Sequence, residues 1–219
     1  MSVIKQKPNE KCVSLLSPTA MGQASAFLWN SQMMIQMSCR GFATAQYMHP
    51  EPRKYAYAPT LEAQSFMQPE QPHYAHHPGR FFYIKDHSTD TLFSAPYEPV
   101  RTELDEFEFI SGQHYLAWRI VKNEIAIEIK LSLSRDHAAE LWSITLTNHA
   151  KSKRKLDVTP YFPVGYMSWM NQSGAYDDEL QAIVCRSVTP YQKVVYYPKI
   201  KKLKDFSYLL AETKPSNEL

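Results

Sequence analysis

Two glutamates with strand-like spacing are the first candidates for chemistry in this sequence. Glu106 and Glu108 are two positions apart, so in a strand both lie on one face, about 6.5–7 Å from each other. That separation resembles the one between the acid and the base in inverting hydrolysis of a glycosidic bond. However, Phe107 and Phe109 alternate with the two glutamates. We therefore expect both carboxylates to face solvent, opposite a buried aromatic face.

Three histidines raise the question of a metal site, because imidazole is the commonest nitrogen ligand. His73, His76 and His77 lie in a proline-rich segment (PHYAHHPG), and no carboxylate or thiolate stands at ligand spacing. We interpret them as groups that hydrogen-bond a loop and expect no metal. The sequence also contains no glycine-rich phosphate-binding loop and no recognisable motif of a Ser/His/Asp or Cys/His catalytic site. We therefore predict no catalytic residue.

An aromatic cluster in the segment PYFPVGYMSWMNQSG is a candidate for ligand binding. Its members are Tyr161, Phe162, Tyr166 and Trp169. Flat rings with polar tips could stack on sugar rings, and they could equally fill a sandwich core or a subunit interface. Both interpretations stay open at this point.

The elements that would position these residues are predicted to be strands. Period-two alternation is clearest at 125–134, where Ile and Leu alternate with polar residues, and it recurs at 142–147. Met33, Ile35 and Met37 favour another strand, and 182–188 and 193–197 are further candidates. Prolines crowd residues 48–78, which predicts an extended surface loop. The pattern predicts an all-β sandwich of antiparallel sheets with little helix.

Size and composition narrow the class of protein. A chain of 219 residues with a formal charge of +2 fits one large domain and no nucleic-acid partner. Residues 1–16 are predicted to be a polar lead-in to an ordered region, 17–219. No secretory signal or membrane span is recognisable. Cys12, Cys39 and Cys185 show no spacing typical of a disulfide framework, so we expect a cytoplasmic protein.

Several longer sequence segments indicate a known family. They include SPTAMGQASAFLWN, CRGFATAQYMHPEP, MQPEQPHYAHHPGRFFYIKD, FSAPYEPVRTELDEFEF, AELWSITLTN and SVTPYQKV. From about Ser17 to its end, the sequence resembles the N-terminal domain of the inverting disaccharide phosphorylases of glycoside hydrolase family 94. Within that family, YAHHPGRF and PYFPVGYMSWMNQS look most like the branch that acts on cellobionic acid.

The resemblance implies a super-sandwich related in shape to galactose mutarotase. In the family, a helical barrel that follows this domain supplies the single catalytic acid and the phosphate site. Inverting phosphorolysis needs only one protein carboxyl group because phosphate itself attacks the anomeric carbon. No residue here matches the barrel, so we expect the catalytic barrel to be absent and this chain to be inactive alone. The implied co-substrate is inorganic phosphate, with no other cofactor.

The resemblance also implies a binding site and a partner. In the family, this domain builds a homodimer interface and lends a loop to the partner's active site. The matching word SVTPYQKV makes Gln192, with Tyr191 and Lys193, the expected substrate contacts, and Trp169 is a further candidate. An amide offers two donors and an acceptor to sugar hydroxyls. The alternative is that 189–193 is only a proline-directed turn.

We therefore expect the N-terminal carbohydrate-binding and dimerisation domain of a phosphorylase that acts on β-linked glucosides such as cellobionic acid or cellobiose. The full-length protein would release glucose 1-phosphate. One alternative is a free-standing carbohydrate-binding or scaffold module without activity. Another is a mutarotase-like epimerase, which would need a His and a Glu that converge on a concave sheet face.

Overall fold

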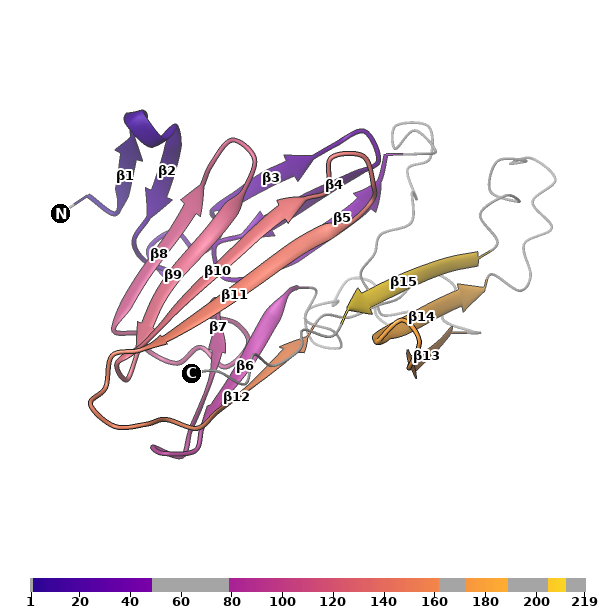
Figure 1. The fold of residues 1–219 in the computed structure, drawn as a ribbon. Coiled ribbons are helices and arrows are strands. Elements are labelled where there is room, and N and C mark those ends of the chain that lie inside the picture. Colours follow the sequence, from indigo (N-terminus) through magenta and orange to yellow (C-terminus); the bar gives the residue numbers. More distant parts are fainter. Residues whose placement is uncertain (1, 49–78, 162–171, 189–204, 212–219) are drawn as a thin grey trace, which may run out of the picture.

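The computed structural model describes residues 2–48, 79–161, 172–188 and 205–211, and it confirms an all-β fold (Figure 1). Among these residues, the one helical element is a 3-10 turn, η1 (Pro8–Glu10). None of their helices is therefore long or apolar enough to cross a membrane. The strands are β1 (Ile4–Lys7), β2 (Cys12–Leu15), β3 (Ser25–Trp29), β4 (Met33–Ser38), β5 (Ala43–Tyr47), β6 (Phe81–Asp86), β7 (Thr91–Ala95), β8 (Glu106–Ser111), β9 (Leu116–Lys122), β10 (Ile125–Leu133), β11 (Glu140–Asn148), β12 (Leu156–Tyr161), β13 (Gln172–Asp177), β14 (Ala182–Val188) and β15 (Asp205–Ala211).

A six-stranded antiparallel sheet forms one layer of the sandwich, in the order β1-β2-β8-β9-β10-β11. Its fifth strand, β10, has the alternation that the sequence predicts. Ile125, Ile127 and Ile129 are buried, whereas Glu128 and Lys130 between them are exposed. Branched side chains suit a pleated face that packs on a core, and the charged residues leave the other face to solvent.

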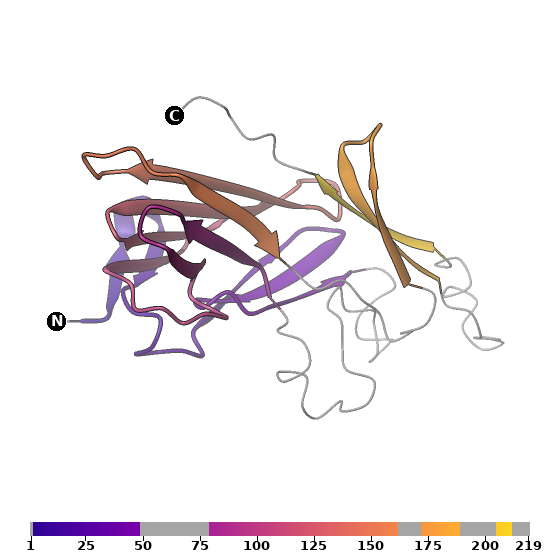
Figure 2. The same cartoon turned by 90° about the horizontal axis from the view of Figure 1, so that it is seen from below.

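Two shorter sheets, β3-β4-β5 and β12-β6-β7, form the opposite layer. One core cluster joins the layers, with Leu28 from β3, Ile35 from β4 and Ile84 from β6 facing the isoleucines of β10. Figure 2 shows the six-stranded sheet on one side of this core and the two shorter sheets on the other. A third short sheet, β13-β14-β15, contributes no member to the cluster among the described residues.

Aromatic rings link the two layers. Trp118 of β9 is fully buried, stacks on Trp142 of β11 at 6.1 Å between ring centroids, and contacts Phe109 at 5.1 Å. Trp142 in turn contacts Phe82 of β6 at 6.0 Å. The Trp118 Nε1–H donates to the carbonyl oxygen of Cys39 at 2.8 Å, so the ring is hydrogen-bonded although it is buried.

Residues 1–16 are not merely the polar lead-in that the sequence predicted, because most of them form β1 and β2. β2 pairs with β8, and Leu15 lies opposite Phe109 in the core. Cys12 and Ser14 are also buried, whereas Lys5 and Gln6 of β1 are exposed. The prediction failed because one short edge hairpin buries few apolar side chains, and its many polar residues dominate the composition. The predicted loop at 48–78 and the predicted strand at 193–197 lie mainly or wholly outside the described residues.

Candidate functional site

The four predicted substrate-binding residues lie outside the described residues and stay predictions. Gln192, Tyr191 and Lys193 belong to 189–204, and Trp169 belongs to 162–171. The same holds for the three histidines at 73, 76 and 77. What the structure does place is the backbone that leads into each segment, because β14 ends at Val188 and β12 ends at Tyr161.

Tyr161 is the described member of the predicted aromatic cluster, and it packs against other rings. Its ring stacks on Phe81 at 6.3 Å and meets Tyr83 edge-on at 6.1 Å. Burial, together with the neighbouring Tyr161, raises the pKa of Tyr83. The Tyr161 side chain is still 39% exposed. For this residue, the contacts agree with packing at the edge of the core.

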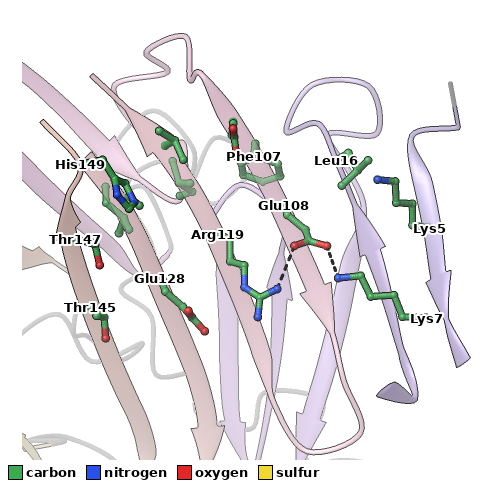
Figure 3. Close-up of a pocket in the computed structure, with 15 residues that line it drawn as sticks. Lys5, Lys7, Leu16, Phe107, Glu108, Arg119, Glu128, Thr145, Thr147 and His149 are labelled. Atoms are coloured by element: carbon green, nitrogen blue, oxygen red, sulfur yellow. Dashed lines mark hydrogen bonds and ion pairs between the residues drawn. The ribbon is translucent and has the colours of Figure 1, made fainter. Parts of the chain in front are cut away.

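A concave region of about 630 Å³ lies on the outward face of the six-stranded sheet (Figure 3). It crosses β1, β8, β9, β10 and β11, and each strand contributes polar side chains. These are Lys5, Lys7, Glu106, Glu108, Arg119, Glu128, Thr145, Thr147 and His149. We call this region the outer groove. The sequence did not reveal it because polar residues that alternate along a strand look the same on any solvated face.

Charges alternate across the outer groove. Lys7 Nζ lies 2.8 Å from Glu108 Oε1, and Arg119 Nη1 lies 3.5 Å from Glu108 Oε2. Arg119 also stands opposite Glu128 in the pairing of β9 with β10. Figure 3 shows Lys7 and Arg119 on either side of Glu108. Both glutamates of the predicted pair lie on the outward face, but only Glu106 is fully exposed, because Lys7 covers part of Glu108.

The electrostatics of Glu108 do not suit a general acid. Partial burial would raise the pKa of this carboxyl group, but the hydrogen bond and charge of Lys7, together with Ser14 and the Arg119 charge, outweigh burial and lower the pKa below its ordinary value. A catalytic acid near neutral pH needs the opposite shift. Glu108 therefore stays ionised as the centre of an ion-pair network.

The outer groove also lacks a converging histidine and glutamate. Glu128 stands opposite Thr145, and His149 is four residues further along the chain. At a rise of about 3.4 Å per residue, these positions are roughly 13 Å apart, too far for one acid–base pair. The described residues also contain no group of histidines, cysteines and carboxylates that could hold a metal. The groove can offer hydrogen bonds and balanced charge, but no reactive pair.

A buried ion pair anchors the beginning of β11 instead of serving a site. Arg80 donates from Nε and Nη2 to the two carboxylate oxygens of Glu140, at 2.9 and 2.7 Å. Trp142 Nε1 donates to the same carboxylate at 2.8 Å. Burial alone would raise the pKa of Glu140, but the Arg80 charge and these hydrogen bonds lower it. The arginine of the word GRFF thus has a structural role.

A second buried carboxylate links two segments that are distant in the sequence, one around residue 40 and one around residue 98. Glu98, which is fully buried, accepts two hydrogen bonds from Arg101 Nε at 2.8 and 3.1 Å and forms an ion pair with Arg40. The Arg40 guanidinium also lies over the Tyr97 ring, 5.2 Å from its centroid. Buried charges persist where they are paired in this way.

The chain was compared with known proteins. A family model described as the glycosyl hydrolase 94 supersandwich domain matches residues 71–186. Cellobionic acid phosphorylase of Neurospora crassa is 53% identical over 216 residues, which is 99% of this chain and 27% of that protein. A 3-O-beta-D-glucopyranosyl-beta-D-glucuronide phosphorylase of Paenibacillus borealis is 32% identical over 104 residues, 48% of this chain and 14% of that protein. Solabiose phosphorylase of the same species is 28% identical over 79 residues, which is 36% of this chain and 10% of that protein. The chain spans 27% or less of the length of these relatives.

Proposed function

Because the chain belongs to glycoside hydrolase family 94, we propose that it serves as the β-sandwich domain of a phosphorylase that cleaves β-linked glucosides with inorganic phosphate. Cellobionic acid and cellobiose are the proposed disaccharides, and glucose 1-phosphate is the proposed product. The observation that carries this proposal is the 53% identity to a cellobionic acid phosphorylase over 99% of the chain.

The proposed contribution of this domain is binding and assembly, without chemistry. An ionised, ion-paired Glu108 and the separation of Glu128 from His149 both favour a reaction centre elsewhere in the protein. Gln192, flanked by Tyr191 and Lys193, is proposed to contact the sugar with its amide, and Trp169 to add a ring face. The segment that carries Gln192 follows β14, which pairs on both edges, so its first residue starts from a fixed strand.

The direct test incubates the purified chain with cellobionate and inorganic phosphate and measures glucose 1-phosphate. The expected result is no release at any chain concentration, because the general acid that protonates the leaving sugar is proposed to lie outside this domain. Release that rises in proportion to chain concentration would contradict a purely supporting role.

The proposed homodimer is tested separately by sedimentation equilibrium. We expect a mass of two chains at micromolar concentration and dissociation on dilution. A monomer over the whole accessible range would remove dimerisation from the proposed role, and the assignment to a phosphorylase would be unaffected.

A further inference from the structure

The outward face of β3-β4-β5 carries two exposed aromatic rings that the fold does not use. Phe27 is 49% exposed and Trp29 is 70% exposed, whereas Ala26 and Leu28, which alternate with them along the strand, are buried. The exposed fraction of Trp29 is the largest among the large apolar side chains in the described part of the chain. Single exposed apolar residues are ordinary on protein surfaces, but two large rings two positions apart on one sheet face form a local apolar patch, a feature that marks interaction sites.

The backbone beside Trp29 is held rigidly. Asn30 Nδ2 donates to the carbonyl oxygens of Ser134 and His137, at 2.6 and 2.9 Å. Asn30 Oδ1 accepts from the backbone N–H groups of Gln32 and Met33, both at 2.8 Å. One side chain thus fixes the turn between β3 and β4 and ties it to the connection between β10 and β11. Trp29 is presented on a preorganised strand end, which lowers the entropy cost of binding.

The strand pairing places uncharged residues beside the two rings. Gln36 of β4 stands opposite Phe27, and Thr44 of β5 stands opposite Gln36. One line of neighbouring residues across the three strands therefore carries an aromatic ring, an amide and a hydroxyl group. Met34 stands opposite Trp29 in the next row. A flat apolar surface beside an amide matches the chemistry of a pyranose ring, which has an apolar face of C–H groups and an edge of hydroxyl groups.

The size of this face favours a small ligand over a protein. Three strands about 4.8 Å apart and five residues long at about 3.4 Å per residue cover roughly 240 Å². A specific protein–protein interface buries about 800 Å² on each partner.

We propose that Phe27, Trp29 and Gln36 form a sugar-binding platform for β-linked gluco-oligosaccharides. The two aromatic rings would stack on the apolar faces of pyranose rings, and the Gln36 amide would hydrogen-bond hydroxyl groups of the same sugar. The platform uses none of residues 189–193, so it is a sugar contact additional to the one proposed above. It rests on the proposed function only for the choice of glucosides as ligands.

Isothermal titration calorimetry of the full chain with cellotetraose tests the platform. We expect saturable binding, and we expect Trp29→Ala to weaken it roughly tenfold or more, because covering about 60 Å² of apolar ring surface corresponds to that change in affinity. Phe27→Ala and Gln36→Ala should weaken it by smaller factors. Leu141→Ala is the matched control, since Leu141 is 54% exposed on a different sheet, and it should leave affinity unchanged. Thermal unfolding checks that each variant is folded.

Three results would overturn the platform. One is no saturable heat with cellotetraose at millimolar concentration, and another is unchanged affinity in a folded Trp29→Ala chain. The third is a Trp29→Ala chain that keeps its sugar affinity but loses self-association in sedimentation, which would assign this face to a second copy of the chain. Because no phosphate enters these titrations, their failure is distinct from a failure of the phosphorylase proposal.

Discussion

Two buried carboxylates, Asp86 and Glu98, and one largely buried carboxylate, Glu140, each have an arginine partner. Asp86 accepts from Arg154 Nη1 at 2.7 Å, Glu140 accepts from Arg80, and Glu98 pairs with Arg101. Each pair joins residues that are not adjacent in a strand ladder, and two of them span 60 and 68 positions of sequence. Such pairs contribute to specificity more than to net stability, because desolvation offsets much of the attraction.

Breaking one of these pairs is expected to be costly. Glu140→Ala would leave the Arg80 guanidinium buried without its carboxylate, and a loss of about 3–5 kcal/mol of unfolding free energy follows from cases of this kind. Replacing both residues with methionine should recover most of that loss, because the two opposite charges of the pair are then removed together. Urea unfolding of the two variants against the wild type measures both effects. A Glu140→Ala chain as stable as the wild type would show that the pair is irrelevant to folding.

Acid should destabilise the fold through the same carboxylates. For Asp86, burial opposes ionisation, but the backbone N–H of Ser88, hydrogen bonds from Thr89 and the charge of Arg154 together lower its pKa below the ordinary value. The pKa of Glu140 is likewise lowered below 4.5. A carboxyl group whose pKa is lower in the folded state stabilises that state above the unfolded pKa, and this contribution is lost as pH falls through the folded value.

The urea midpoint should therefore be nearly constant from about pH 7 to pH 5 and should fall as the pH drops below about 4.5. Asp86→Asn should show a shallower decrease in this acid range, because one linked carboxyl group is removed. The comparison needs the same buffer and ionic strength for both chains. A midpoint that rose on acidification would contradict the direction assigned to these pKa values.

At the scale of elements, the strands that alternate strictly were predictable and the edge hairpin was not. β10 was recognisable because five isoleucine and leucine positions repeat with period two, with the charged Glu128 and Lys130 among the residues between them. β2 was missed because the segment was judged by its own polar composition. Its burial depends instead on pairing with β8, some 95 positions away in the sequence. The outer groove was missed for a related reason, since its lining depends on the register of distant strands.

Removing residues 1–16 tests the corrected role of the N-terminal hairpin. The deletion takes Leu15 out of the core and uncovers one edge of β8, so we expect a loss of at least about 2 kcal/mol in unfolding free energy. A true polar lead-in would leave stability unchanged. Urea unfolding of the shortened chain measures the difference, and Lys5→Ala serves as a control because Lys5 is exposed.

At the scale of the whole molecule, several sequence segments that identified the family contribute residues that stabilise the fold. CRGF contains Arg40, GRFF contains Arg80, and AELW contains Glu140 and Trp142, and all of these residues belong to buried ion pairs or ring contacts. The fold could therefore be predicted well from sequence. The predicted sugar contacts at 191–193 came from resemblance alone, because an amide in a proline turn carries no local signal of its ligand.

If this chain is a phosphorylase domain, it should be able to replace the matching domain of an active phosphorylase. The decisive measurement exchanges the matching 216 residues of the Neurospora crassa cellobionic acid phosphorylase for this chain and assays glucose 1-phosphate from cellobionate and phosphate. We expect the chimera to release product, while the chain alone releases none. A chimera that unfolds cooperatively, and is therefore folded, yet releases no product would contradict the assignment of this chain as a phosphorylase domain.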